Sequence, residues 1–384
     1  MPLIAGRAKG LLADFSAAGV LAAADVQVAA RLGELVGEHD DAALLAAALT
    51  VRGTRLGAVV FDLATAADTV AAEAEDGAPV PLAWPPAEEW VHRCAGSPLV
   101  TGAGARPLRM VGARMWLTRY WKQEEFVAAD LLRRVGGRPD GLDREALERD
   151  LAALFDDDDQ RAAARIAVAS RLSVLAGGPG TGKTTTIARL LAALLRQQPA
   201  ARVALAAPTG KAAARLAEAV QGARDRLTAE DRARLAALPA STLHRLLRRR
   251  PGRSSRFVHD RDNRLPFDVV VVDECSMVPL TMMARLLEAL PPAARLVLVG
   301  DPDQLASVEA GAVLGDLVPG DAEPAEPLRA SVARLTTVRR YTEGSSTDTL
   351  AKLIRAGRST EVLELLTAGP PGLEFSAVPD DEPV

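Results

Sequence analysis

The strongest chemical pattern in the sequence is a glycine-rich run that ends in Lys183 and Thr184. Residues 177–184 read GGPGTGKT and match the pattern G-x-x-x-x-G-K-[ST]. Glycines in such a run let consecutive backbone N–H groups turn toward a phosphate chain, and the start of a following helix favours negative charge. A lysine at this position reaches the β- and γ-phosphates, and the threonine hydroxyl is a ligand for Mg²⁺. The run predicts a site for ATP and Mg²⁺ in which Lys183 is catalytic.

The predicted nucleotide site lies between an apolar run and an amphipathic segment. LSVLA, at 172–176, precedes the glycines, and TTIARLLAALL follows them. A strand that leads into a phosphate-binding loop and then into a helix is the context that this chemistry requires. The nucleotide contacts are therefore assigned to nine consecutive residues: Gly177, Gly178, Pro179, Gly180, Thr181, Gly182, Lys183, Thr184 and Thr185.

Two further polar groups follow apolar runs. Asp273 and Glu274 come directly after VVVV, and LVLV leads into a turn that contains Gln304. Carboxylates at the carboxyl end of a buried parallel strand face the crevice in which ligands bind. We expect Asp273 to coordinate Mg²⁺ beside Thr184, Glu274 to activate the attacking water, and the amide of Gln304 to bond the γ-phosphate or that water. Glu274 and Gln304 join the lysine of the first loop as catalytic candidates.

The elements that must position these loops are strands buried on both faces. Four short apolar runs alternate with helical segments, at 172–176, 203–207, 269–272 and 296–299. This alternation predicts an α/β fold in which helical crossovers connect the strands of a parallel sheet. Residues 10–150 instead show apolar positions at three-to-four spacing, which predicts a mostly helical region.

The helical region has two compositional features. All four tryptophans lie in it, which predicts either a packed core of its own or a docking face. Residues 1–100 hold 6 basic and 13 acidic side chains. This acidic balance agrees with a protein partner better than with DNA, and equally with an ordinary solvated surface.

Composition narrows the class of protein. Of 384 residues, 48% are hydrophobic and 25% charged, which excludes a disordered tail and predicts two or three packed domains. Although the formal charge is only -4, residues 202–264 hold 15 basic and 6 acidic side chains, a local footprint for a polyanion. Two cysteines exclude a disulfide framework or a zinc cluster. No apolar run reaches about 18 residues, so we expect no membrane span and a cytoplasmic location.

In combination, these motifs resemble those of superfamily 1 DNA helicases, and most of all those of the RecD family, the α subunits of exodeoxyribonuclease V. The resemblance rests on five segments: GGPGTGKTTT at 177–186, APTGKAAARL at 207–216, STLHRLL at 241–247, VVVDECSMV at 270–278 and LVGDPDQLASVEAG at 298–311. It implies a RecA-like P-loop NTPase motor domain, preceded by a mostly helical domain and followed by the start of a second RecA-like domain.

The resemblance also implies domain boundaries. We expect a helical partner-docking domain at 1–150, the ATPase domain at 151–325, and the beginning of a second motor domain at 326–384. The later motifs of a second motor domain, including a late arginine, are not found after LAKLIRAG. The chain therefore resembles a shortened member of the family.

Some site residues follow from the resemblance alone. Gln160, in Asp159-Gln160-Arg161, matches the glutamine that reads adenine in the family. The segment LTTVRRY, at 335–341, resembles the start of the second motor domain and places Arg340 as the arginine that reaches the γ-phosphate across the cleft. Such an arginine stabilises transition-state charge. Arg339 is the competing candidate.

Candidate DNA contacts come from the basic part of the chain. The residues that match strand-contacting family motifs are Pro208, Thr209, Lys211, Thr242 and His244. Threonine and lysine side chains are suitable phosphate ligands. The run RRRPGRSSRFVHDRDNR, at 248–264, is either a basic hairpin beside the DNA, with Phe257 and His259 as stacking groups, or a solvated arginine loop.

The function implied by the resemblance is that of an ATP-dependent 5′ to 3′ DNA helicase or translocase. Such a subunit belongs to a RecBCD-type exonuclease in double-strand-break repair and recombination, with single-stranded DNA and RecB-like and RecC-like subunits as partners. The alternative is an assembly subunit that binds ATP as a structural clamp and performs no motor work. A kinase or GTPase is disfavoured because no guanine-selective motif is found.

Overall fold

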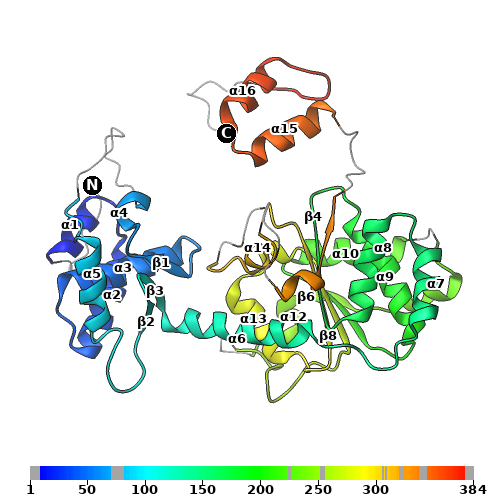
Figure 1. Ribbon diagram of the computed structural model, residues 1–384, viewed down its shortest axis with the longest axis horizontal. Coiled ribbons are helices and arrows are strands. Elements are labelled where there is room, and N and C mark those ends of the chain that lie inside the picture. Colours follow the sequence, from blue (N-terminus) through cyan, green and yellow to red (C-terminus); the bar gives the residue numbers. More distant parts are fainter. Residues whose placement is uncertain are drawn as a thin grey trace.

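Figure 1 shows the computed structural model of the chain, in which helix α6 (Thr118–Val135) connects a small N-terminal body to a larger α/β body. The structure describes residues 9–70, 82–223, 226–250, 256–304, 307, 309–319, 324, 326–336 and 344–376. Among these residues, no helix combines the length and apolar character that crossing a membrane requires.

The N-terminal body packs helices against a small antiparallel sheet. Its helices are α1 (Leu11–Ala17), α2 (Ala23–Val36), α3 (Asp41–Arg55), α4 (Ala66–Thr69) and α5 (Ala87–Gly96). Its strands, β1 (Val60–Asp62), β2 (Leu108–Val111) and β3 (Arg114–Leu117), pair in the order β1-β3-β2. The sheet was not predicted, because strands of three or four residues are too short to show a clear alternation of apolar and polar positions.

The core of the N-terminal body surrounds α3, most of whose residues between Ala42 and Thr50 are buried. Trp90 is fully enclosed in this core, and its indole Nε1 donates to the carbonyl of Ala42 at 2.8 Å. The ring of Trp84 lies edge-on to Phe15. For Trp90 the core interpretation is thus confirmed, since its ring is not available to a docking partner.

The larger body is built on a six-stranded sheet in which every pairing is parallel. Its strand order is β6-β5-β7-β8-β4-β9. The strands are β4 (Leu172–Gly177), β5 (Val203–Ala207), β6 (Ala240–Thr242), β7 (Val269–Val272), β8 (Arg295–Gly300) and β9 (Val332–Leu335). The predicted α/β class, with its parallel sheet and helical N-terminal region, is confirmed.

Helices cover both faces of this sheet, which explains why its strands are continuous apolar runs. One face packs against α7 (Arg144–Leu154), α8 (Asp158–Ala169), α9 (Lys183–Gln197), α10 (Gly210–Gly222) and α11 (Ala229–Ala236). The other face packs against α6, α12 (Leu243–Leu247), α13 (Leu280–Ala289) and α14 (Val313–Leu317). Short 3-10 turns lie at Cys275–Met277 and Leu328–Ser331. The helices α15 (Ser346–Arg355) and α16 (Ser359–Thr367) pack against each other.

The packed cores divide the chain differently from the expected boundaries at 150 and 325. Helix α6 lies on the large sheet, where the buried Arg134 pairs with Asp130 and donates to the carbonyl of Ala294 at 2.8 Å. Helix α7 also belongs to a core of this sheet. At the other end, β9 pairs with β4 and extends the sheet to Leu335. Amphipathic spacing predicted helices in this region but could not indicate which body they pack against.

Candidate nucleotide and nucleic-acid site

The glycine-rich loop turns between β4 and α9 as the motif requires. Gly180 and Gly182 adopt φ values of +82° and +84°, a region in which other residues are strained. Lys183 is the first residue of α9, and its Nζ donates to the carbonyl of Gly178 at 2.9 Å and to that of Gly177. The hydroxyl of Thr181 donates to the carbonyl of Gly178 at 2.9 Å. These bonds fix the loop and keep the lysine cation over it.

A cavity of about 580 Å³ lies in front of this loop. It is formed by residues of three strand ends and one neighbouring helix: Pro179, Gly180, Thr181, Gly182, Lys183, Thr184, Thr185, Arg215, Glu274 and Gln304. The loops after β4, β7 and β8 meet here because these strands are neighbours in a parallel sheet. The structure thus brings together the lysine, the glutamate and the glutamine that the sequence proposed as catalytic.

Asp273 and Glu274 lie where β7 ends. Burial raises the pKa of Asp273, and the nearby charge of Glu274 raises it further, while the backbone N–H of Glu274 and the Lys183 cation oppose the shift. The N–H of Glu274 donates to Asp273 Oδ1 at 2.9 Å. Glu274 itself has φ +52°, a left-handed backbone that is uncommon for a glutamate and that marks a constrained position.

The residues at this site are suitable for Mg²⁺ in the presence of a nucleotide. Within the described part of the chain, no three His, Cys, Asp or Glu side chains form a cluster that would hold a metal by themselves. Asp273, which is close enough to Lys183 for their charges to interact, offers a carboxylate oxygen, and Thr184 in the cavity lining offers a hydroxyl oxygen. Mg²⁺ is commonly held in this way, by one or two protein oxygens together with substrate phosphates.

Sequence reasoning missed Arg215, which lines the nucleotide cavity from α10. Its side chain is exposed and makes no hydrogen bond or ion pair with another described residue. Arg215 lies within the segment APTGKAAARL, four residues after Lys211 and therefore on the same face of the helix. The signal was present in the motif, but the position of α10 beside the cavity was needed to interpret it.

Among the predicted nucleotide contacts that the structure describes, Gly177, Gly178 and Gln160 do not line this cavity; Gly177 and Gly178 line a smaller one of about 250 Å³ that shares Thr181 with it. Gln160 is buried near the start of α8, and its Oε1 has no hydrogen-bond partner among the described residues. Its neighbour Asp159 accepts a hydrogen bond from the hydroxyl of Thr336 at 2.8 Å, at the carboxyl end of β9. Gln160 therefore lies at the same edge of the sheet as the glycine-rich loop. Arg340 and its competitor Arg339 fall outside the described residues.

The candidate DNA residues gather at the carboxyl ends of β5 and β6. These strands pair so that Ala207 faces Thr242, which places Pro208 and Thr209 beside the start of α12. Thr209 caps α10, and Thr242 caps α12; each hydroxyl accepts a backbone N–H at 3.2 Å. Lys211 and His244 are both exposed next to these caps. One edge of the sheet thus carries the nucleotide cavity and the predicted DNA contacts side by side.

The basic run at 248–264 includes a short antiparallel pairing. Arg249 forms a bridge with Phe257, and the N–H of Val258 donates to the carbonyl of Arg248 at 2.8 Å. The proposed stacking role of Phe257 is wrong, because its side chain is buried in the core of the large sheet, with its ring 5.9 Å from that of His244. His259 is half-buried, and its Nδ1 lies 3.2 Å from the carbonyl of Asn263. Residues 251–255 fall outside the described residues.

Comparisons with known proteins agree with this geometry. A family model described as the N-terminal domain of RecBCD enzyme subunit RecD matches residues 17–116, and one described as an AAA domain matches residues 160–310. The chain is 51% identical to the RecBCD enzyme subunit RecD of Mycolicibacterium smegmatis over 364 residues, which cover 93% of this chain and 62% of that protein. The chain belongs to the RecD family.

Other relatives of this RecD-family chain show the extent of the similarity. The RecBCD enzyme subunit RecD of Mycobacterium tuberculosis is 49% identical over 384 residues, which cover 98% of this chain and 63% of that protein. An ATP-dependent RecD2 DNA helicase of Deinococcus radiodurans is 44% identical over 141 residues, 37% of this chain and 17% of that protein. The chain thus spans somewhat less than two thirds of the length of the RecD subunits that it matches.

Proposed function

We propose that this chain is the ATPase part of a DNA helicase or translocase subunit that moves 5′ to 3′ on single-stranded DNA within a RecBCD-type exonuclease. The observation that carries the proposal is the cavity that joins Lys183, Glu274 and Gln304 at the sheet edge where Thr209 and Thr242 cap their helices. Because both sites lie at the same edge of the sheet, a structural change on ATP hydrolysis has only a short distance to reach the DNA contacts. The family relatives named as RecBCD subunits support the assignment to such a complex.

Each cavity residue has its own role in ATP hydrolysis. The N–H groups of the loop and Lys183 bind the β- and γ-phosphates, and Glu274 accepts a proton from the attacking water. The amide of Gln304 bonds the γ-phosphate or that water, so its hydrogen bonds differ between ATP and ADP. Thr184 and Asp273 would hold Mg²⁺, which when bound supplies positive charge to the phosphate oxygens. The remaining predicted contacts are Gln160, for adenine, and Arg340, for the γ-phosphate from the second motor domain.

DNA binding is assigned to the adjoining strand ends. The exposed Lys211 offers a cation for a phosphate, and the hydroxyls of Thr209 and Thr242 lie at the starts of their helices. The exposed ring of His244 is available to a base or sugar. The N-terminal body, with its acidic composition, is the part that we assign to contact with RecB-like or RecC-like partner subunits.

Steady-state ATP hydrolysis, measured with and without oligothymidylate, tests this function. Lys183→Ala and Glu274→Gln should each lower the DNA-stimulated rate by about a hundredfold or more, because each removes a group that acts in the transition state. Glu145→Gln is the matched control, since Glu145 is an exposed carboxylate of α7 outside the cavity. ATP binding without turnover, unaffected by DNA, would contradict a motor and support the nucleotide clamp.

Direction is tested on DNA that carries biotin at one end. A 5′ to 3′ translocase should displace streptavidin from the 3′ end of a single strand much faster than from the 5′ end. The measurement should use this chain with its partner subunits as well as alone, since the chain spans only part of its relatives' length. Displacement from the 5′ end would reverse the proposed direction without affecting the ATPase assignment.

A further inference from the structure

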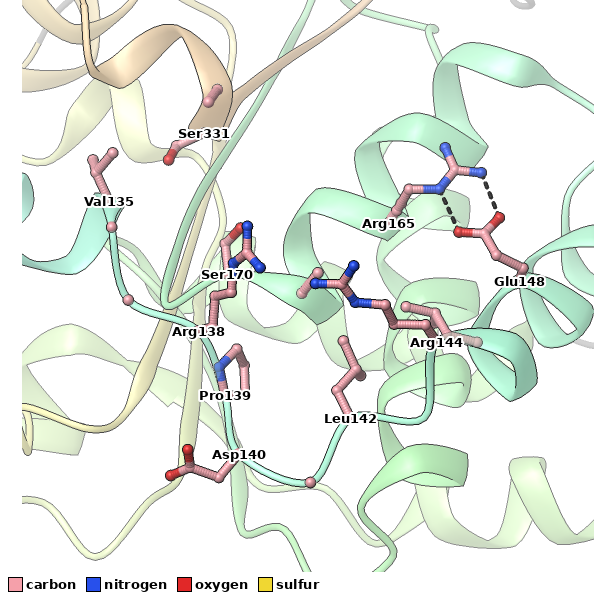
Figure 2. Close-up of a pocket in the computed structure, with 16 residues that line it drawn as sticks. Val135, Arg138, Pro139, Asp140, Leu142, Arg144, Glu148, Arg165, Ser170 and Ser331 are labelled. Atoms are coloured by element: carbon pink, nitrogen blue, oxygen red, sulfur yellow. Dashed lines mark hydrogen bonds and ion pairs between the residues drawn. The ribbon is translucent and has the colours of Figure 1, made fainter.

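A second large cavity, of about 780 Å³, lies at the opposite edge of the sheet (Figure 2). It is enclosed by the 136–142 loop between α6 and α7, the first turn of α7, and the end of α8. Ser170 and Ser331 also line it; Ser170 lies two residues before β4, and Ser331 directly precedes β9. The cavity therefore lies at the amino ends of these strands, away from the proposed ATP site, and its volume suits a ligand of nucleotide size.

Three arginines line this cavity, but only one of them is paired. Arg165 donates to both carboxylate oxygens of Glu148, at 2.6 and 2.7 Å, and this contact lowers the pKa of Glu148. Arg138 and Arg144 make no side-chain hydrogen bond or ion pair with any residue that the structure describes. Figure 2 shows their guanidinium groups approaching the same space from two sides, while the carboxylate of Asp140 points away from it. The cavity thus presents two uncompensated cations.

The loop that carries Arg138 is fixed before any ligand arrives. The carbonyl of Gly137 accepts the N–H of Arg171 at 3.0 Å, and the carbonyl of Asp140 accepts Gln198 Nε2 at 3.1 Å. A Cβ atom on Gly137 would lie only 2.7 Å from Cδ of Arg171, so the loop and the Arg171 side chain are in close contact. A cation on a fixed loop loses less conformational entropy when it binds.

Positive charge continues behind this loop. Arg171 directly precedes β4, and Arg295 begins the neighbouring strand β8. Arg295 is only 3% exposed, and none of its guanidinium nitrogens has a hydrogen-bond partner among the described residues. Burial, and then the charge of Arg171, lower the pKa of Arg295 to about 10. Nearby carboxylates are already engaged, Asp130 by Arg134 and Asp268 by Arg202. An anion in the cavity would reduce this repulsion.

We propose that the cavity at the amino edge binds a phosphate-bearing ligand of about nucleotide size through Arg138 and Arg144. Guanidinium groups match phosphate oxygens in a bidentate manner, which makes arginine a preferred phosphate ligand. Pro139, Leu142 and Leu147 provide an apolar surface for the organic part of such a ligand. The phosphate comes either from a free nucleotide or from the end of a DNA strand. The site is independent of the ATP cavity and of the function proposed for it.

Residue-resolved modification of the full chain with phenylglyoxal, read by mass spectrometry, tests this site. The probes are inorganic pyrophosphate, AMP, and an oligothymidylate with or without a 5′-phosphate. At saturating probe we expect modification of Arg138 and Arg144 to slow about tenfold, as for sites that are nine-tenths occupied. Arg149, an exposed arginine of α7 outside the cavity, should react at an unchanged rate. The rate at Arg215 reports separately on the proposed ATP cavity.

The probes also identify the source of the phosphate. Protection by pyrophosphate or AMP supports a free ligand, and protection only by the 5′-phosphorylated oligonucleotide supports a strand end. Unchanged rates at Arg138 and Arg144 with every phosphate probe would overturn the proposal. Arg138→Ala should abolish pyrophosphate protection of Arg144, and Arg144→Ala that of Arg138, whereas Arg149→Ala should leave both protected.

Discussion

The two edges of the large sheet both carry positive charge, but they balance it differently. At the carboxyl edge, Lys183 is held by loop carbonyls and lies near the carboxylates of Asp273 and Glu274. At the amino edge, Arg138 and Arg144 have no carboxylate partner among the described residues, and the buried Arg295 lacks one as well. One edge combines cations with carboxylates that can accept protons, whereas the other has two arginines that no described carboxylate pairs with.

This difference indicates that one edge is suited to phosphate hydrolysis and the other only to phosphate binding. Hydrolysis requires a base for the attacking water and an oxygen ligand for a metal ion, as well as cations for the phosphates. We propose that Asp273 and Glu274 supply these functions at a cost in folding energy, because one is a partly buried carboxylate and the other has a strained backbone. Of the two carboxylates that line the amino-edge cavity, that of Glu148 is paired with Arg165 and that of Asp140 points away, so we expect this cavity to bind phosphate without transforming it.

The largest expected effect follows from replacing Asp273. Asp273→Asn should lower DNA-stimulated ATP hydrolysis by about a hundredfold to a thousandfold, since a metal ligand supplies several kcal/mol of charge stabilisation. The same variant should be more stable than the parent chain at neutral pH without nucleotide, because the amide carries no charge to bury. Hydrolysis assays and urea unfolding measure the two effects; a loss of both activity and stability would argue against the assigned role.

The pH dependence of stability sharpens this prediction. Because the folded state raises the pKa of Asp273, the folded protein binds this proton more tightly than the unfolded chain. The parent chain therefore gains stability from this group as the pH falls through the raised pKa, and loses that contribution as the pH rises. The difference in unfolding free energy between Asp273→Asn and the parent should shrink on acidification. A difference that is constant with pH would exclude Asp273 as its source.

A smaller effect is expected at Arg215, which joins the nucleotide cavity to the helix of the DNA contacts. Arg215→Ala should lower the DNA-stimulated rate by about tenfold, the value of one charge-assisted hydrogen bond. Lys211→Ala, one helical turn away, should instead weaken binding to oligothymidylate and reduce the salt slope by about one unit. Equal losses of DNA affinity in both variants would place Arg215 on the DNA rather than on the nucleotide.

The sequence predicted the carboxyl edge far better than the amino edge, for a physical reason. A phosphate loop is continuous in sequence, and its strand and helix are adjacent to it, so residues 177–185 could be assigned directly. The cavity at the amino edge combines residues 135–148, 165–170 and 330–331, which only tertiary packing brings together. The predicted stacking role of Phe257 was wrong for a related reason. The sequence of a basic run does not indicate whether an aromatic ring within it points to the solvent or to the core.

Glycine substitutions compare the rigidity of the two edges. A Cβ on Gly177 would lie 2.8 Å from the hydroxyl oxygen of Thr181 and 3.0 Å from the carbonyl of Leu335, both of which are held in place. Gly177→Ala should therefore destabilise the chain by about 1–3 kcal/mol. Gly137→Ala should cost under about 1 kcal/mol, because the atom it meets belongs to the longer side chain of Arg171. Urea unfolding ranks the two variants, and the reverse order would show the 136–142 loop to be the more tightly packed.

The smallest effect is expected at the ion pair that borders the amino-edge cavity. Glu148→Gln removes the partner of Arg165, and because this pair is largely exposed, stability should change by less than about 1 kcal/mol. The freed guanidinium would add a third cation to the cavity, so pyrophosphate should protect Arg138 and Arg144 at a concentration about two- to fivefold lower. Glu145→Gln, in the same helix but outside the cavity, should leave that concentration unchanged. If neutralising Glu148 weakens protection, the carboxylate takes part in holding the ligand, and the assignment of binding to the arginines fails.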